Sequence, residues 1–422
     1  MTATAQSPVD RSFDPISIST LDFWRAPFDE RDKTFAQLRQ ERPVSWHPNM
    51  DFSYIEQSTP GFWAVVGHQD IQDISRNPKV FSSAEGTMLG DTPEFLSLPS
   101  SSFLNMDDPR HARLRKLVSV AFTPKRIAQF EVRLAGRATE IVDELIDRGD
   151  CDFVQNVARQ LPMWSISEFM GVPQGQRHIA SHAADLQASG GIDPSLNEGL
   201  EPLEAIKKSV GTLRGIGMGL AEQRRWHGEE DLITGLVNAE IDGESLTDSE
   251  IGAFCNLLSV AGNDTTRNTI SHAMLALTNN PDQRQLLIDD FDRYIDSAVE
   301  EFLRWGTAVM TFRRTTTEAT EIAGVPIAAG EKVVMFYNSG NRDDAAFTNP
   351  HTFDITRDPN PHLSFGGGGA HFCLGTMLAR TQLKAIFREL FTRLPKLEVS
   401  DPQLMLSTFI HGVNSMPCTL NK

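Results

Sequence analysis

The spacing of apolar residues predicts a chain made mainly of helices. The period of an amphipathic helix, with apolar side chains three and four positions apart, occurs in residues 111–120, 125–148, 156–170, 179–186, 202–225 and 296–305. Short apolar or alternating runs bounded by turn residues predict strands at residues 62–66, 315–327 and 332–337. We therefore expect a mainly α protein with small β-sheets.

The longest predicted helix covers residues 246–280. Thr247 and Glu250 have the spacing of a capping box at its start, and Pro281 closes it. About 32 residues at 1.5 Å each give roughly 48 Å, so this helix should cross the middle of the molecule. Its apolar sequence is interrupted by Ala261-Gly-Asn-Asp-Thr-Thr266. A final helix is expected after Cys373, as far as Leu394.

The chain shows no internal repeat and no domain linker. Residues 1–18 are expected to form a flexible N-terminal lead-in, and residues 19–422 a single domain. Two long loops are predicted, at residues 86–102 and 338–369, and loops of that length within a compact domain are often functional.

Charge and composition exclude several classes of protein. The net charge of −17 argues against a nucleic-acid partner and against binding to anionic lipid surfaces. No stretch approaches about 20 apolar residues and no secretory signal is visible, so we expect a cytoplasmic protein without stable membrane insertion. The four cysteines are far apart, which indicates neither a zinc site nor a disulfide framework; they are Cys151, Cys255, Cys373 and Cys418.

One cysteine lies in a glycine-rich sequence, Phe365-Gly-Gly-Gly-Gly-Ala-His-Phe-Cys373-Leu-Gly375. Glycines let the backbone adopt positive φ and approach a flat ligand closely. Backbone N–H groups and the start of the next helix favour a thiolate at Cys373, and a thiolate is a known ligand of haem iron. Taken alone, however, the loop is as readily explained by a turn around a buried structural cysteine.

Five separated motifs, in the same order, resemble those of the cytochrome P450 family, and the resemblance extends over residues 22–419. They are Met106-Asp-Asp-Pro-Arg-His111 with Arg115, Ala261–Thr266, Glu301-Phe-Leu-Arg304, Asn341-Arg-Asp343 with Phe353-Asp354 and Arg357, and Pro361-His-Leu363 leading into the cysteine loop. The resemblance implies the family's triangular-prism fold, with haem b between the long central helix and the cysteine loop. It also implies a monooxygenase.

The resemblance assigns roles to individual residues. Cys373 is the axial iron ligand, Asp264 and Thr265 form an acid–alcohol pair that delivers protons to bound dioxygen, and Gly262 leaves room for oxygen. The predicted haem contacts, of which the histidines and arginines meet the propionates, are Ala261, His111, Arg115, Arg313, Phe365, Gly367, His371 and Gly375. Glu301 and Arg304 are expected to form a buried ion pair with Arg357.

Two assignments stay open. Arg314 would take the place of Arg313 if the strand shows its other face, which the sequence does not decide. The hydroxyl of Thr265 has the alternative of bonding back to a carbonyl of its own helix.

An apolar pocket is predicted for a small hydrophobic substrate. Its expected lining consists of Met88, Leu89, Phe95, Leu96, Leu98, Phe103, Leu257, Val260, Ala261, Val309 and Met310. Phe365 lies eight residues before Cys373 instead of the family's usual seven. This extra residue, together with the sequences 261–268 and 407–412, resembles actinobacterial, mycobacterial-type methyl-branched lipid ω-hydroxylases. That resemblance implies ω-hydroxylation of methyl-branched fatty acids or isoprenoid lipids, with sterol side-chain oxidation as the alternative.

A basic stretch in this acidic chain suggests where electrons enter; it consists of Arg110, Arg113, Arg115, Lys116, Lys125 and Arg126. A charge run is usually a solvated face, but in this family that helix lies on the thiolate side, where redox partners dock. We expect a monomer that uses O2, an acidic ferredoxin and an NAD(P)H-dependent ferredoxin reductase. The alternatives are a peroxygenase, against which the Asp264–Thr265 pair argues, and a non-catalytic haem-binding protein.

Overall fold

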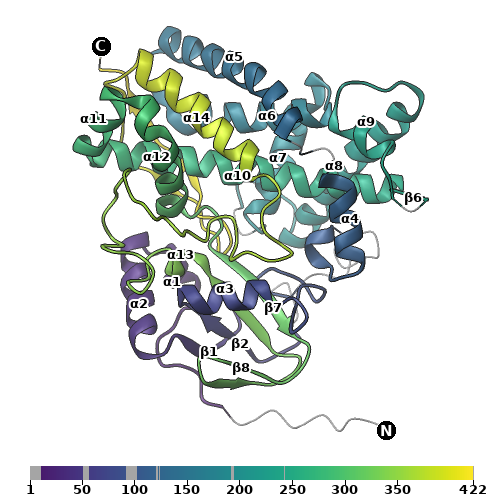
Figure 1. Cartoon of the computed structure of the whole chain (residues 1–422), viewed down its shortest axis with the longest axis vertical. Coiled ribbons are helices and arrows are strands. Elements are labelled where there is room, and N and C mark those ends of the chain that lie inside the picture. The colour runs from purple at the N-terminus through teal and green to yellow at the C-terminus, as the bar shows by residue number, and fades with distance from the viewer. Residues whose placement is uncertain are drawn as a thin grey trace.

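The computed structural model describes residues 11–50, 57–91, 102–119, 122, 124–191, 194–241 and 243–421. A large helical part lies above a smaller part that holds the main sheet (Figure 1). The helices of the larger part are α4 (Arg110–Ser119), α5 (Pro124–Arg148), α6 (Gln160–Met170), α7 (Arg177–Ala188), α8 (Pro202–Trp226), α9 (Leu232–Val237), α10 (Asp248–Asn279), α11 (Pro281–Asp289), α12 (Phe291–Gly306) and α14 (Thr376–Arg393). The mainly α architecture predicted from the sequence is confirmed.

Helix α10 crosses the middle of the molecule (Figure 1) and packs against α8, α6, α7 and α12. Its start is the predicted capping box, because Thr247 accepts from the Glu250 amide and Glu250 accepts from the Thr247 amide. The polar sequence 261–266 lies within this one continuous helix. Of its polar side chains, Asn263 donates to Asp185, Asp264 forms an ion pair with Arg267, and Thr265 donates to the Ala261 carbonyl. Pro281 ends α10 and also begins α11, where a missing N–H costs nothing.

The main sheet has five strands in the order β1-β2-β10-β7-β3. Their bounds are β1 (Val44–Pro48), β2 (Gly61–Val65), β10 (Lys332–Phe336), β7 (Thr311–Thr316) and β3 (Phe81–Ser82). The β2–β10 pair is parallel and the other pairs are antiparallel. The short helices around it are α1 (Leu21–Arg25), α2 (Phe28–Glu41), α3 (His68–Arg76) and α13 (Tyr337–Gly340). Helix α2 has few apolar residues, which is why no helical period predicted it.

The remaining strands form small sheets. A three-stranded sheet has the order β11-β14-β4, with bounds β11 (Glu398–Val399), β14 (Pro417–Thr419) and β4 (Cys151–Asp152). Three two-stranded pairs are β5 (Glu240–Ile241) with β6 (Glu244–Ser245), β8 (Thr320–Ile322) with β9 (Val325–Ile327), and β12 (Gln403–Leu404) with β13 (Val413–Ser415).

Residues 11–18 pack onto the main sheet. The Asp14 amide donates to the carbonyl of Trp46 at 2.7 Å, Phe13 stacks on the Trp46 ring, and Ile18 is completely buried. The predicted flexible lead-in is therefore wrong for residues 11–18, and residues 1–10 lie outside the described part. Within the described residues, no helix is both long enough and apolar enough to cross a membrane.

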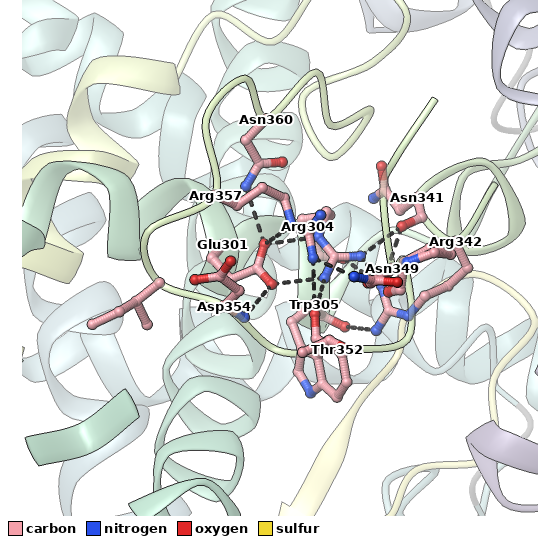
Figure 2. A network of polar contacts seen from close by, with 12 residues as sticks. Glu301, Arg304, Trp305, Asn341, Arg342, Asn349, Thr352, Asp354, Arg357 and Asn360 are labelled. Carbon is pink, nitrogen blue, oxygen red and sulfur yellow. Dashed lines mark hydrogen bonds and ion pairs between the residues drawn. The ribbon is translucent and has the colours of Figure 1, made fainter. Parts of the chain in front are cut away.

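A buried carboxylate on α12 holds the long loop that leads to Cys373 (Figure 2). Glu301 accepts two bonds of 2.7 Å from Arg304, one of 3.2 Å from Arg357 and one of 3.1 Å from Asn360, and its carboxylate also accepts the Asp354 amide at 2.9 Å. Arg304 donates in addition to backbone carbonyls of the loop. The predicted Glu301–Arg304–Arg357 ion pair is confirmed. It anchors a segment that has little regular structure of its own.

Candidate active site

The cysteine loop is a tight turn packed against α3. The Cys373 amide donates to the Phe365 carbonyl at 3.0 Å, which closes the turn. Gly366, Gly368 and Gly369 have φ angles of +94°, +97° and +76°, a region that favours glycine. A Cβ on Gly367 would lie 2.5 Å from the hydroxyl of Ser75 on α3. The glycine run therefore serves both the turn and a close approach to α3.

The side chain of Cys373 opens into an internal cavity of about 470 Å³. It is exposed to that cavity although protein surrounds it. Burial raises the pKa of the Cys373 thiol, whereas the Gly375 backbone and the charges of Arg115 and Arg380 lower it. These donors and cations favour the thiolate, the form that binds metal.

Helix α10 lines the same cavity with small side chains. Ala261, Gly262 and Thr265 line it, and Ala261 is exposed to it. A Cβ on Gly262 would lie 2.9 Å from Cδ1 of Ile166, so this glycine also permits α10 to pack closely against α6. The predicted role for Gly262, space for oxygen, is thus accompanied by a packing role that the sequence did not indicate.

Two neighbouring arginines on β7 face opposite sides of the sheet. Arg313 pairs opposite Val334 and Arg314 opposite Val333, so their side chains alternate. Arg314 lines the cavity, whereas Arg313 does not line it and binds Asp91 at 2.7 Å. The structure therefore brings Arg314, and not the predicted Arg313, to the cavity where the propionate contact is expected. The sequence could not decide this because the register of β7 depends on its partner strand.

The rings of the two predicted histidines are in contact, with centroids 4.2 Å apart and planes tilted by 35°. His371 lines the cavity, and His111 lies behind it beside Asp108. Burial, reinforced by Arg314, lowers the pKa of His371 to about 3, so His371 is neutral at neutral pH. Nε2 of His111 is buried and has no hydrogen-bond partner among the described residues. Arg115 lines the cavity and donates to the Phe372 carbonyl.

Thr265 and Asp264 lie on different sides of α10. Thr265 lines the cavity, and its hydroxyl donates to the Ala261 carbonyl at 2.6 Å. Asp264 is fully buried away from the cavity, and its Oδ1 lies 2.5 Å from Nη2 of Arg267. Arg267 in turn binds Asp185 of α7 at 2.8 Å. Burial, opposed in part by Arg267, raises the pKa of Asp264 to about 7. The Thr265 hydroxyl therefore lies at the cavity, whereas the Asp264 carboxyl lies on another face of α10.

The cavity is largely apolar, as predicted. The predicted residues that line it are Met88, Leu89, Phe103, Leu257, Val260, Ala261 and Val309. The prediction for Met310 is wrong. This residue is buried in the core next to the main sheet, with its sulfur 3.3 Å from Nη1 of Arg31. Ala308 lines the cavity nearby. Phe95, Leu96 and Leu98 lie outside the described residues.

Sequence reasoning missed several polar residues of the cavity wall. Gln187 of α7, Arg214 of α8 and Asn256 of α10 all line it. Gln187 donates to the Asn256 side chain at 2.9 Å. No local sequence signal marks them, because three separate helices bring them together. Phe409 and Ile410, in the C-terminal segment, also line the cavity.

These residues fit a thiolate-ligated haem. Cys373 supplies a thiol open to the cavity, and α10 supplies a wall of small side chains. Arg115 and Arg314 supply guanidinium groups for two carboxylates. Phe365, Gly367 and Gly375 also line this region, in agreement with their predicted positions.

Known proteins resemble the whole chain. A methyl-branched lipid omega-hydroxylase from Mycobacterium tuberculosis is 41% identical over 409 residues, which cover 96% of this chain and 94% of that protein. A steroid C26-monooxygenase from Mycolicibacterium smegmatis is 37% identical over 403 residues, 94% of this chain and 91% of that protein. The solved structure of a Mycobacterium marinum cytochrome P450 in complex with pseudoionone has a TM-score of 0.93 and 47% identity, and covers 97% of this chain and 99% of that one.

The description of the matching family agrees with the cavity chemistry. The cytochrome P450 family model matches residues 220–409, a range that includes α10, the Glu301 anchor and the cysteine loop. Proteins of this family carry a haem whose iron is bound by a thiolate, and they use O2 and electrons from a redox partner. The chain therefore belongs to the cytochrome P450 family and is a haem-thiolate monooxygenase.

Proposed function

We propose that this monooxygenase hydroxylates the terminal carbon of a methyl-branched fatty acid or an isoprenoid chain. The Cys373 thiolate would bind the haem iron, and the haem, when bound, would supply the chemistry that activates dioxygen. Arg115, Arg314 and His371 would bind the haem carboxylates. Thr265 and the neighbouring α10 residues form the wall against which the reacting end of the substrate lies.

The distribution of polar side chains in the cavity supports hydroxylation at the terminal (ω) carbon. Asn256 precedes Thr265 by nine residues, which is about 13.5 Å along a helix. Gln187 and Arg214 accompany Asn256, and Arg214 also reaches Ser249, farther toward the start of α10. A long substrate with one polar end therefore gains hydrogen bonds when that end lies near Asn256. Its apolar terminus is then at Thr265.

The relatives support the substrate class. The Mycobacterium tuberculosis protein is named for methyl-branched lipids, and the Mycobacterium marinum protein was solved with pseudoionone, an isoprenoid ketone. The apolar wall formed by Leu257, Val260 and Phe103 suits such chains. A sterol side chain is the second candidate, because steroid C26-monooxygenases are 37–38% identical to this chain.

Proton delivery is proposed to involve both members of the acid–alcohol pair. The Thr265 hydroxyl presents a proton at the cavity wall, and the Asp264 carboxyl exchanges protons near neutral pH because burial raises its pKa to about 7. Rotation of the Asp264 side chain away from Arg267 would bring the two groups onto one path. General acid catalysis of this kind typically contributes about 10²–10⁴ in rate.

Electrons are proposed to come from an acidic ferredoxin, itself reduced by an NAD(P)H-dependent reductase, to the monomeric enzyme. The basic stretch supports this only in part. Arg110 and Arg113 lie against Glu250 and Glu244, and Arg115 faces the cavity. Lys116 is exposed on α4. The side chains of Lys125 and Arg126 lie outside the described residues.

A spectral binding screen tests the substrate. Branched fatty acids, isoprenoids and sterols are titrated, and the low-to-high-spin shift of the Soret band is recorded for each. Turnover with ferredoxin and reductase then gives the position of the new hydroxyl. We expect the tightest binding, and terminal hydroxylation, for a branched acid or isoprenoid.

The Asn256→Leu variant sharpens this test. It should weaken binding of a branched acid more than binding of the matching hydrocarbon. Asn279→Leu is the matched control, since Asn279 is exposed at the end of the same helix. Hydroxylation at internal carbons, or an equal loss for acid and hydrocarbon, contradicts the proposed orientation.

A further inference from the structure

Two cysteines that are 267 positions apart in the sequence face each other across a small sheet. Cys151 on β4 is the direct antiparallel partner of Cys418 on β14. Their sulfur atoms are 3.8 Å apart. Both are free thiols. Neither takes part in the cavity, so the monooxygenase reaction does not explain the pair.

We propose that Cys151 and Cys418 form a reversible disulfide when the enzyme is exposed to hydrogen peroxide. Directly opposed residues of an antiparallel pair have Cα atoms about 4.5–5.5 Å apart, within the range of about 4.4–6.8 Å that disulfides require. The sulfur atoms need to approach from 3.8 Å to about 2.05 Å, which side-chain rotation supplies without separating the strands.

The reaction balances with peroxide as the oxidant. The thiolate of Cys151 attacks one peroxide oxygen, which gives a sulfenic acid and, after protonation of the leaving hydroxide, one water. The sulfur of Cys418 then attacks the sulfenic sulfur, forms the S–S bond and releases a second water. Two thiols are oxidised and one peroxide is reduced, with the two thiol protons ending in the two waters.

Exposure decides which sulfur reacts first. Cys151 is half-buried, whereas Cys418 is 3% exposed, so peroxide reaches Cys151. Burial raises the pKa of the Cys151 thiol and raises that of Cys418 to about 12. Both groups are therefore protonated at neutral pH. The pair should oxidise slowly and only under sustained peroxide, and faster as the pH rises.

The bond would fasten the C-terminal segment. β14 lies between β11 and β4, and the chain just before it is already bound to β4's end, where the Phe153 amide donates to the Met416 carbonyl at 2.8 Å. Phe409 and Ile410, a few residues earlier, line the cavity. A cross-link that closes so long a loop restrains the unfolded chain, so it should raise the unfolding temperature.

Peptide mapping of the full-length holoenzyme tests the proposal. The protein is treated with hydrogen peroxide, quenched with catalase, alkylated while denatured and digested with trypsin without reductant. Residues 149–159 and 397–422 are the tryptic peptides that carry the two cysteines. We expect them joined, two hydrogens lighter than their sum and separable by dithiothreitol, with an unfolding midpoint raised by several degrees.

Controls separate this bond from other oxidation. Cys151→Ser and Cys418→Ser should each abolish the linked peptide and the temperature shift, and Cys255→Ser, which removes a buried thiol of α10, should keep both. A parallel sample oxidised with diamide avoids peroxide damage to the haem, which the Soret band monitors. Sulfinic or sulfonic acid at Cys151 without a linked peptide, or an unlinked pair after both oxidants, overturns the proposal.

Discussion

The hydroxyl of Thr265 is bonded to the carbonyl oxygen of Ala261, 2.6 Å away and one turn earlier on α10. The side chain that faces the cavity is therefore already satisfied within its own helix. To donate a hydrogen bond into the cavity, the hydroxyl has to break its bond to the Ala261 carbonyl, which requires a rotation about χ1 of Thr265. The Thr265 hydroxyl can return to this bond after each proton transfer.

Thr265→Ala should uncouple the enzyme. Without a hydroxyl at the cavity wall, product formed per NADH is expected to fall about tenfold or more, since a positioned acid contributes about 10²–10⁴. Hydrogen peroxide should rise in proportion. Thr265→Ser keeps the hydroxyl and should restore most of the coupling. Equal product per NADH in the Ala variant and the wild type would exclude the relay.

Replacing Arg314 or Arg313 by leucine should have different effects. Arg314→Leu is expected to speed haem transfer to apomyoglobin, because Arg314 lines the cavity. Arg313→Leu should leave that rate unchanged and lower the free energy of unfolding instead. The loss should lie near the lower end of about 3–5 kcal/mol, because Lys332 still binds the stranded Asp91 at 2.8 Å. Faster haem loss in Arg313→Leu alone would contradict the register of β7.

Glu301→Gln should destabilise the loop that leads to Cys373. The carboxylate is fully buried and has two arginine partners, so the unfolding free energy should fall by about 3–5 kcal/mol. Haem content per protein should fall with it. Asp296→Asn on the same helix is the control: its ion pair with Lys384 is exposed and worth about 1 kcal/mol or less. Full haem content in Glu301→Gln would refute the anchoring role.

Two stacked histidines should make the fold sensitive to acid. Burial lowers the pKa of His272 to about 4 and lowers that of His411 well below its usual value, whereas both titrate near 6.5 when unfolded. Between these pKa values, the unfolded chain therefore binds more protons than the folded protein does. Stability should be full above pH 6.5 and fall as the pH drops toward 4, by about 1.4 kcal/mol per pH unit for each histidine.

His272→Gln isolates this effect. It removes one titrating group while keeping a donor for the His411 carbonyl, which Nε2 of His272 reaches at 3.0 Å. Urea unfolding between pH 7 and pH 4.5 should show a shallower loss than the wild type. His178→Gln, at an exposed position, should follow the wild-type curve. Parallel curves for His272→Gln and the wild type would mean that folding does not lower the pKa of His272.

Lys116→Glu should slow electron entry. The charge reversal on α4 removes an exposed cation from the proposed ferredoxin surface, so the association rate constant should fall and become less dependent on salt. Stopped-flow reduction at several ionic strengths measures both. Lys33→Glu on α2 is a charge-matched control. Salt-independent reduction of the wild-type protein would argue against an acidic partner at this surface.

Much of the fold and part of the site could be predicted because the signals are local. The capping box of α10 and the Glu301–Arg304 pair depend on spacings of three residues within one helix, which the sequence displays directly. The cysteine loop is likewise contiguous. For these features, local sequence and tertiary structure agree.

The errors share one cause, since each depended on a partner distant in the chain. Whether Arg313 or Arg314 faces the cavity is decided by pairing with β10. Asp264 turns from the cavity toward Arg267, which is held by Asp185 of α7, 82 positions earlier in the chain. Cys151 and Cys418 face each other although 267 positions of sequence lie between them. None of these partners is marked by a local pattern.

The central position of α10 has a consequence for redesigning the substrate range. Leu257 and Val260 line the cavity from a helix that also packs against α6, α7, α8 and α12. Both side chains also pack against buried clusters, so a larger or smaller residue there disturbs the core while it reshapes one wall of the cavity. Met88 lines the same cavity from a loop and is only half-buried, whereas its neighbour Leu89 belongs to a buried core cluster. Libraries for new substrates should therefore begin at Met88, where a change of side chain leaves the packing of α10 intact.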